Sequence, residues 1–422
     1  HTLKPLRQAT SVHPMANSND ITRRGFFGAS LGGLVGLESA NLSSVAQRHR
    51  PIPLPAPMSV WTMATPALVL DAEIMEVNLK RMAEHTRAAQ VGFRPYVTTH
   101  KCPVIARRQL ELGAAGIAVA KISEAEVMAE GGLENILITS PVVTRGKLAR
   151  LLALVREHPK VQIVVDQREN VRDLNDAAAS VGLTLSVFVD FNMGADRTGI
   201  SIGRDAVNLV AAIERSPALS LAGVQAYAGQ LQHLVGWDQR RQQSGQLLTR
   251  VMDVVREIRS AGHVVPAITA GGTGTYDIDT EVEGVTEIQA GSYLFMDSYY
   301  RSIGGSAGTV FEDFLPSLFV LATAISQPVQ GRITIDAGQK AFATDKAPPE
   351  LRDIQGVKYH WAGDEYGILE FQEPSRNIRI GDKVLLLTPH CDLTVNLYDH
   401  LYVMRQEEIA EVWPIAARGQ SQ

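Results

Sequence analysis

The sequence predicts an α/β protein: a (β/α)₈ barrel followed by a mostly-β domain. From residue 90 onwards, short apolar runs alternate with longer amphipathic stretches, which is the pattern of parallel strands joined by helices. Eight such runs occur within about 200 residues, a span that suits this barrel. After residue 312 the apolar runs are separated by Gly, Pro and Asn turns. An open doubly wound sheet is the competing architecture, but no Gly-x-Gly-x-x-Gly motif follows an early strand.

The overall composition is that of an ordinary globular enzyme. The 422 residues are 45% hydrophobic and 20% charged, which excludes intrinsic disorder and a coiled coil. The net charge is −5, and the 40 basic and 45 acidic residues are interspersed, so the sequence shows no basic surface for nucleic acid. Two cysteines, Cys102 and Cys391, are too few for a disulfide scaffold.

Residues 1–60 differ from the rest of the chain and are predicted to be an export signal and a linker. Arg23 and Arg24 precede a glycine-rich apolar run, residues 28–37, in the order of a twin-arginine signal, which predicts a periplasmic protein. The run is well short of the roughly 20 residues that span a bilayer, so no membrane span is expected. An exposed basic turn before a small helix is the alternative interpretation. The proline-rich residues 50–57 predict a stiff linker.

The predicted barrel occupies residues 61–310, and its strands and helices follow one another in order. The apolar runs that we expect to be strands are 92–97, 116–120, 135–139, 161–165, 184–190, 221–226, 265–270 and 285–289. The amphipathic segments between them, expected to be helices, include 123–130, 148–157, 168–180, 205–215 and 238–261. An earlier apolar run, residues 65–71, precedes the first barrel helix and is also able to join the β domain.

The predicted β domain, residues 311–415, contains a candidate metal site. If the segment Pro389-His390-Cys391-Asp392 is extended, His390 and Asp392 lie on one face and Cys391 on the other. An imidazole nitrogen with a hard oxygen favours manganese, magnesium or a similar ion over structural zinc. A hydrogen-bonded His-Asp pair at the surface is the alternative. The strands expected in this domain are 319–325, 331–336, 368–372, 382–387 and 401–405.

Polar residues gather at the ends of the predicted barrel strands, where barrels of this kind carry their chemistry. The loop after the seventh strand, residues 271–275, combines glycines that allow close backbone approach with hydroxyl donors, as phosphate sites do. Its place in the barrel supports this, whereas an ordinary glycine-rich loop is the alternative. The other polar strand ends are 98–101, Lys121, 139–140, 190–197, Gln225 with Tyr227, and 289–293.

Several separate segments together resemble one family. They are Thr65-Pro66-Ala67, Arg94-Pro95, 99–102, 223–233, 271–276, 286–297, Asp336-Ala337-Gly338 and 389–399. Jointly they extend over nearly all of residues 64–410 and resemble the metal-activated D-threonine aldolase and D-serine dehydratase group of pyridoxal-phosphate enzymes, which has the alanine racemase fold (fold type III). The resemblance implies a cofactor bound at the strand ends and a small D-amino acid substrate. It also implies a β domain that meets a second subunit in a homodimer.

The metal motif separates the two branches of this family. The dehydratases carry His-x-Cys, which suits zinc, whereas this chain has Asp392 two residues after His390, as the aldolases do. The resemblance therefore favours a lyase: an aldolase that cleaves D-threonine-like D-β-hydroxy-α-amino acids to glycine and an aldehyde. The aldolase is expected to need a divalent cation, Mn²⁺ in the first place, with Mg²⁺ or a similar ion as the alternative. Dehydration of a D-hydroxyamino acid such as D-serine to a 2-oxo acid and ammonia is the alternative.

One segment departs from the family pattern. Members have Arg-Pro-His-x-Lys-x-His-Lys at the end of the first barrel strand, and the first of these lysines forms the Schiff base with the cofactor. This chain has Tyr96 for the first histidine and Thr98 for that lysine, while Lys101 matches the second lysine. Strand alternation is expected to point residue 98 inward and to place residue 101 beyond the strand end. Three interpretations stay open: Lys101, or more remotely Lys121, serves instead; the substrate amine attacks free cofactor aldehyde; or the chain is a catalytically silent cofactor-binding homologue.

The resemblance also assigns roles to the remaining polar residues. His233 is the expected base, although a histidine just beyond a strand is often structural. Arg197 matches an arginine that approaches the phenolic oxygen of the cofactor, and the alternative is an ion pair with Asp190 or Asp196. The residues expected to line the cofactor ring or to clasp its phosphate are Gln225, Tyr227, Gly272, Thr273, Gly274, Thr275, Tyr276, Gly291 and Ser292.

Overall fold

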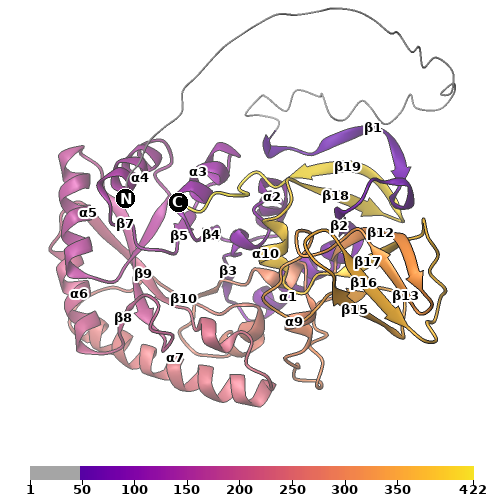
Figure 1. The fold of residues 1–422 in the computed structure, drawn as a ribbon. Helices are drawn as coiled ribbons and strands as arrows, with labels where there is room; N and C mark the ends of the chain where they lie inside the picture. Colours follow the sequence, from indigo (N-terminus) through magenta and orange to yellow (C-terminus); the bar gives the residue numbers. More distant parts are fainter. Residues whose placement is uncertain (1–47) are drawn as a thin grey trace, which may run out of the picture. The chain divides into compact units, whose positions relative to one another are not determined.

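The computed structural model describes residues 48–422, which form a parallel barrel sheet and a second, mostly antiparallel sheet (Figure 1). The predicted export signal around residues 22–37 lies outside the described residues. Within residues 48–422, no helix is long and apolar enough to cross a membrane.

The barrel sheet has the eight parallel strands that the apolar runs predict. Its strand order is β3-β11-β10-β9-β7-β6-β5-β4, and a bridge between Tyr96 and Ala118 joins the two ends of this order. A short further strand, β8 (Ile200–Ser201), pairs with the end of β7. The barrel prediction is confirmed. The eight strands are β3 (Gly92–Phe93), β4 (Ile117–Val119), β5 (Ile136–Ile138), β6 (Gln162–Val165), β7 (Leu185–Asn192), β9 (Leu219–Ala226), β10 (Ala267–Ala270) and β11 (Glu287–Ile288).

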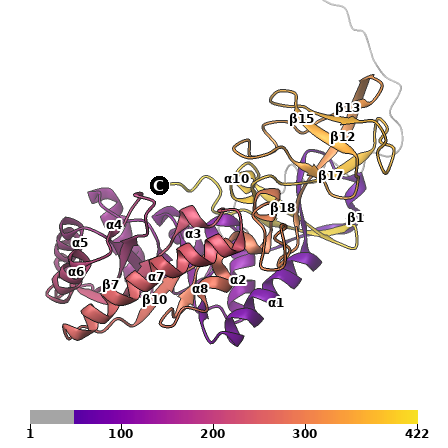
Figure 2. The same cartoon turned by 90° about the horizontal axis from the view of Figure 1, so that it is seen from below.

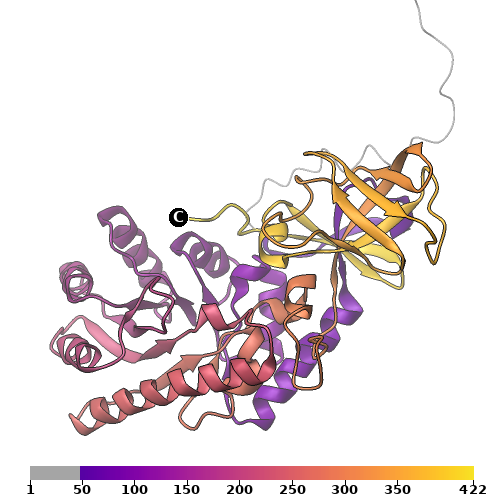
Figure 3. The same cartoon turned by 60° about the horizontal axis from the view of Figure 1, so that its bottom comes forward.

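Helices connect the barrel strands in sequence order (Figure 3). The first helix begins after Asp71, whose side chain accepts the N–H of Ile74 at 3.1 Å. The second begins with Pro103, at a position where the missing N–H removes no helical hydrogen bond. The helices are α1 (Ala72–Ala88), α2 (Pro103–Glu111), α3 (Ile122–Glu130), α4 (Arg145–Glu157), α5 (Arg168–Ser180), α6 (Arg204–Glu214), α7 (Trp237–Ser260), and the short α8 (Tyr276–Asp279) and α9 (Ser298–Arg301).

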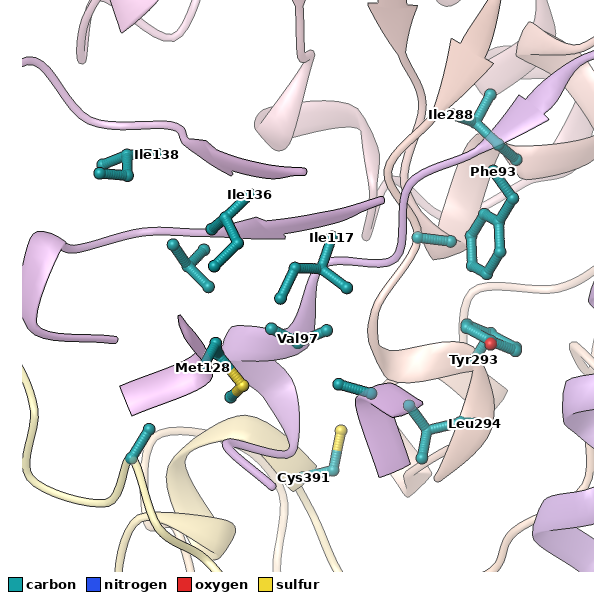
Figure 4. Packing of buried hydrophobic residues seen from close by; sticks show 14 of the residues in the cluster. Phe93, Val97, Ile117, Met128, Ile136, Ile138, Ile288, Tyr293, Leu294 and Cys391 are labelled. Atoms are coloured by element: carbon teal, nitrogen blue, oxygen red, sulfur yellow. The ribbon is translucent and has the colours of Figure 1, made fainter. Parts of the chain in front are cut away.

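Apolar side chains fill both faces of the barrel sheet. Successive side chains of a strand point to opposite faces, so Ile117 belongs to the large core cluster while its neighbour Ala118 belongs to a small separate one. The small cluster also holds Phe188. Figure 4 shows part of the large cluster, with Ile136 of β5 beside Ile117 of β4. Burial on both faces explains why the strands are continuous apolar runs.

The second sheet forms the β domain and includes strands from both ends of the described chain (Figure 2). The run expected at residues 65–71 forms β2 (Ala67–Asp71), which pairs with β12 and β18 and so joins this domain. The remaining elements are β1 (Ile52–Ser59), β12 (Leu318–Val329), β13 (Arg332–Ile335), β14 (Glu350–Leu351), β15 (Val357–Trp361), β16 (Gly367–Phe371), β17 (Lys383–Leu387), α10 (Cys391–Val395), β18 (His400–Arg405) and β19 (Glu408–Pro414).

The proline-rich segment at residues 50–57 is not a linker, which corrects the interpretation of the sequence. It forms most of β1, which pairs with β19 at the edge of the sheet. Prolines cannot donate a backbone hydrogen bond, and an edge strand needs such donors on one side only. Val60 follows β1 and is fully buried. The fold therefore begins before residue 60.

Candidate active site

A cavity of about 210 Å³ lies at the carboxyl ends of the barrel strands and reaches the first turn of α10 in the β domain. Residues of the barrel and of the β domain both line it, so the cavity lies where the two domains meet. Ten of the fifteen predicted site residues line this cavity: Arg197, Gln225, Tyr227, His233, Gly272, Thr273, Gly291, Ser292, His390 and Asp392.

Two short backbone segments form one end of the cavity. Gly272 and Thr273 come from the loop after β10, and Gly291 and Ser292 from the loop after β11. Thr273 and Ser292 each begin a 3₁₀ turn, so their N–H groups lie at helix starts, which have no acceptor within the turn. Free N–H groups on two neighbouring glycine-containing loops fit a phosphate group.

The second half of the glycine-rich loop has a structural role instead. The N–H of Gly274 donates to Oε1 of Gln232 at 2.9 Å, and the hydroxyl of Thr275 donates to Asp279 at 2.8 Å. A Cβ atom on Gly272 would lie 2.4 Å from Oε1 of Gln232, so this side chain also requires a glycine at the start of the loop. Gly274 and Thr275 do not line the cavity, and their predicted part in phosphate binding stays a prediction.

Tyr276 is also directed away from the cavity. Its hydroxyl donates to Asp313 at 3.0 Å, and its ring packs edge-on against Phe311 and Phe314. Burial is the main reason that the pKa of this phenol is raised, so it remains protonated. The side chain of Tyr276 is therefore engaged with Asp313 and does not line the cavity, and its phosphate contact stays a prediction.

Arg197, Gln225 and Tyr227 lie together on another wall. The Arg197 guanidinium is 5.6 Å from the centroid of the Tyr227 ring, and it forms no salt bridge within residues 48–422. Asp190, its expected alternative partner, accepts instead from Gln225 at 2.9 Å and from Thr198 at 2.8 Å. Burial raises the pKa of Asp190 to about 6. The arrangement leaves the Arg197 charge available to a bound anion or phenolate oxygen.

His233 lines the cavity and is held between two tyrosine rings. Its ring stacks on Tyr299 with centroids 4.1 Å apart and lies 4.2 Å from the ring of Tyr300. Its Nε2 atom is buried and makes no hydrogen bond to the described residues. Burial, reinforced by the nearby His390 and Lys346, lowers the pKa of His233 to about 4. A neutral imidazole that lines a cavity can accept a proton.

His390 and Asp392 reach the cavity from the β domain. His390 is extended, but α10 begins at the next residue. The expectation that the whole segment is extended, with side chains on alternating faces, is therefore wrong. The two side chains nevertheless line the same cavity because the helix starts between them. Asp392 accepts the hydroxyls of Thr99 at 2.9 Å and Ser292 at 3.0 Å, so it faces the barrel and not the solvent.

The donor set fits a cation with open coordination positions. In the part of the chain that the structure describes, no group of three or more histidine, cysteine or carboxylate side chains gathers around one point. His390 with Asp392 provides one nitrogen and one carboxylate, and any further ligands would be water or substrate. This matches a catalytic metal site better than a structural one, which has four protein ligands.

No lysine among residues 48–422 lines the cavity. Residues 97–99 form a 3₁₀ turn and not a strand. The alternation of side chains along a strand therefore does not apply to Thr98, and the inward direction predicted for its side chain assumed the wrong local structure. Its hydroxyl donates to Glu124 at 3.0 Å and accepts the N–H of Ala120 at 3.0 Å. The buried ammonium of Lys101 contacts the same Glu124. Lys121 lies at the start of α3 and does not line the cavity either.

Five lining residues were not among the predicted site residues. Tyr96, Thr99, Thr139 and Gln289 stand at strand ends, where their polar character gave a usable signal. Tyr300 lies in α9, beyond any strand, and no sequence pattern marks it.

Comparisons with known proteins agree with this architecture. Residues 70–299 match the family model described as alanine racemase, N-terminal domain, and residues 317–404 match the putative serine dehydratase domain. A D-threonine aldolase of an Arthrobacter species is 35% identical, over 84% of this chain and 93% of its own length. A 3-hydroxy-D-aspartate aldolase of Paracoccus denitrificans is 31% identical, over 87% of this chain and 95% of its own. The crystal structure of D-threonine aldolase from Filomicrobium marinum superimposes with a TM-score of 0.83 at 34% identity, covering 88% of this chain and 99% of that one.

Proposed function

Because this chain belongs to the alanine racemase-fold family of pyridoxal-phosphate lyases that includes the D-threonine aldolases, we propose that it cleaves D-threonine-like D-β-hydroxy-α-amino acids to glycine and an aldehyde. One observation carries this proposal. His390 and Asp392 of the β domain line the same cavity as His233 of the barrel. A metal-binding pair opposite a neutral base suits removal of a proton from a β-hydroxyl group.

Pyridoxal phosphate would be held by residues already in place. The N–H groups of Gly272, Thr273, Gly291 and Ser292 would bind its phosphate, and Arg197 would face the ring oxygen. When bound, the cofactor supplies an electron sink for the carbanion that remains after the bond between Cα and Cβ breaks. The residues of the chain would orient the cofactor, and Arg197 would supply a positive charge.

His390 and Asp392 would hold a divalent cation, Mn²⁺ or Mg²⁺. Such an ion acts as a Lewis acid and lowers the pKa of a hydroxyl group that it binds. His233 would take the proton from that hydroxyl, since its buried ring is neutral at pH 7. Tyr299 and Tyr300 hold the ring of His233 in place through close aromatic contacts.

The cofactor in this protein is proposed to have no covalent bond to lysine. Thr98 cannot supply an amine, and Lys101 is engaged with the buried carboxylate of Glu124. Cofactor affinity would then depend on the phosphate loops, Arg197 and ring contacts. Turnover would be slow, because the substrate amine has no activated lysine bond to displace.

Two other functions remain open and one experiment separates all three. Incubation with D-threonine, pyridoxal phosphate and Mn²⁺ should release glycine and acetaldehyde. A dehydratase would instead give a 2-oxo acid and ammonia. A catalytically silent homologue, which Thr98 favours, would bind the cofactor and give neither product pair. Formation of glycine above a cofactor-only control supports the proposal, and its absence contradicts it.

We further propose that the protein is exported to the periplasm and forms a homodimer. Support for export is the Arg23-Arg24 pattern before a short apolar run, which lies outside the described residues. Support for a dimer is the family resemblance alone. Cell fractionation of the parent and of a double Arg23→Lys, Arg24→Lys variant tests the first, and light scattering of the purified protein tests the second.

A further inference from the structure

Asp345 and Lys346 lie on the segment between β13 and β14, next to His390 of the proposed metal site. The Oδ2 atom of Asp345 is 2.9 Å from Nδ1 of His390. The Nζ atom of Lys346 is 3.6 Å from the same oxygen. Lys346 also lies over the ring of Tyr299, 4.3 Å from its centroid. Neither residue belongs to a motif that the sequence marks as functional.

We propose that Asp345 positions His390 as a metal ligand and that Lys346 weakens cation binding at the same site. The two neighbouring residues would thus set the affinity of the site in opposite directions. This inference rests on the proposed function, because it concerns the cation that His390 and Asp392 would hold.

The hydrogen bond to Asp345 determines which nitrogen of His390 is free. A carboxylate oxygen accepts a hydrogen bond, so Nδ1 of His390 carries the hydrogen and Nε2 carries the lone pair. Metal-binding histidines have this arrangement, in which a carboxylate behind the ring fixes its orientation and strengthens the ligand. Asp345 therefore prepares His390 for a cation although Asp345 itself does not line the cavity.

Lys346 opposes the same arrangement in two ways. Its ammonium lies near Oδ2 of Asp345, the oxygen that also contacts Nδ1 of His390, so the two groups compete for one acceptor. It also places a fixed positive charge beside the site, which repels a divalent cation. The contact with the Tyr299 ring keeps this charge in position, since cations are attracted to aromatic faces. Tyr299 in turn stacks on His233, so the lysine is fixed to the wall of the cavity.

Mn²⁺ binding tests the proposal without reference to turnover. Mn²⁺ alone is titrated into the full chain saturated with pyridoxal phosphate, and free Mn²⁺ is followed by electron paramagnetic resonance. Asp345→Ala should bind Mn²⁺ about 10- to 100-fold more weakly than the parent. Asp345→Asn should lie between them, because its amide oxygen still accepts from Nδ1. Lys346→Met should bind Mn²⁺ about 2- to 5-fold more tightly than the parent, because the variant removes a positive charge beside the site.

Matched controls separate this inference from the proposed function. Lys340→Met removes an exposed lysine of the same segment, paired with Glu365, and should leave Mn²⁺ affinity unchanged. Asp392→Ala should lose the metal. Unchanged affinity in Asp345→Ala, or unchanged or weaker binding in Lys346→Met, would overturn the inference, while loss of Mn²⁺ from Asp392→Ala would still support the metal site. A parent protein that binds no Mn²⁺ would overturn both this inference and the proposed metal site. Glycine release tests the aldolase reaction separately.

Discussion

The hydroxyl of Thr98 donates a 3.0 Å hydrogen bond to Oε2 of Glu124. The same oxygen accepts the backbone N–H groups of Ala120 and Lys121, each at 3.0 Å, and Oε1 contacts the ammonium of Lys101. One buried carboxylate thus binds both the residue that replaces the family lysine and the lysine that follows it in the motif. These contacts explain why neither Thr98 nor Lys101 lines the cavity.

Thr98→Lys should restore the covalent attachment of the cofactor. The new amine would stand at the end of the first barrel strand, and treatment with borohydride should then fix the cofactor to residue 98. Aldolase activity should rise by orders of magnitude, because the substrate amine can displace a lysine from an already activated bond. Thr98→Met, of similar length without an amine, is the control. Equal rates in the two variants would argue against the account.

Glu124→Gln should destabilise the fold strongly. The side chains of Lys101 and Glu124 are 8% and 1% exposed, and removing one partner leaves a buried charge without compensation. We expect a loss of about 3–5 kcal/mol in the free energy of unfolding. Glu134→Gln is the control, since its pair with Lys160 is 65% and 67% exposed and its loss should leave the free energy of unfolding nearly unchanged. Denaturant unfolding measures both, and similar losses would contradict the structural role of Glu124.

The pH dependence of catalysis should reveal His233. Burial is the main cause of its pKa of about 4, well below the ordinary value for histidine. The ring is therefore neutral above this pH and becomes charged, and useless as a base, only as the pH falls through about 4. Activity on D-threonine should persist to about pH 5 and then decline on the acid side. Circular dichroism at each pH controls for unfolding. A decline centred near pH 6.5 would show that His233 is not buried in this way.

Residues 48–60 should be needed for stability. β1 pairs with β19, and Val60 is fully buried, so a chain that begins at residue 61 loses an edge strand and exposes apolar surface. A chain that begins at residue 48 retains both. We expect the longer chain to melt at the temperature of the full chain and the shorter one several degrees lower. Identical melting temperatures would mean that β1 contributes nothing.

The parts of the fold that could be predicted are those with strong local periodicity. The runs at 135–139 and 161–165 form β5 and β6 because both faces of a parallel sheet are buried, which makes each strand continuously apolar. The prolines of β1 concealed a strand, since only its position at the sheet edge makes them tolerable. Periodicity alone cannot show an edge.

The candidate site was less predictable because its details depend on tertiary contacts. His390 and Asp392 could be singled out by residue type, yet their common cavity depends on where α10 begins. Thr275 has the residue type of a phosphate ligand, but its hydroxyl is bound to Asp279 in the following helical turn and to Gln232 from the loop after β9. Thr98 could be identified as a departure, whereas its contact with Glu124 required the structure.

Mass mapping of the unmodified protein tests the central claim most directly. The purified full chain is saturated with pyridoxal phosphate, treated with borohydride, digested and searched for lysines that carry the reduced cofactor. The account predicts that Lys101 and Lys121 remain unmodified, because Lys101 is paired with buried Glu124 and neither lysine lines the cavity. A stoichiometric reduced adduct at Lys101 would contradict it and would mean that this lysine leaves Glu124 to hold the cofactor.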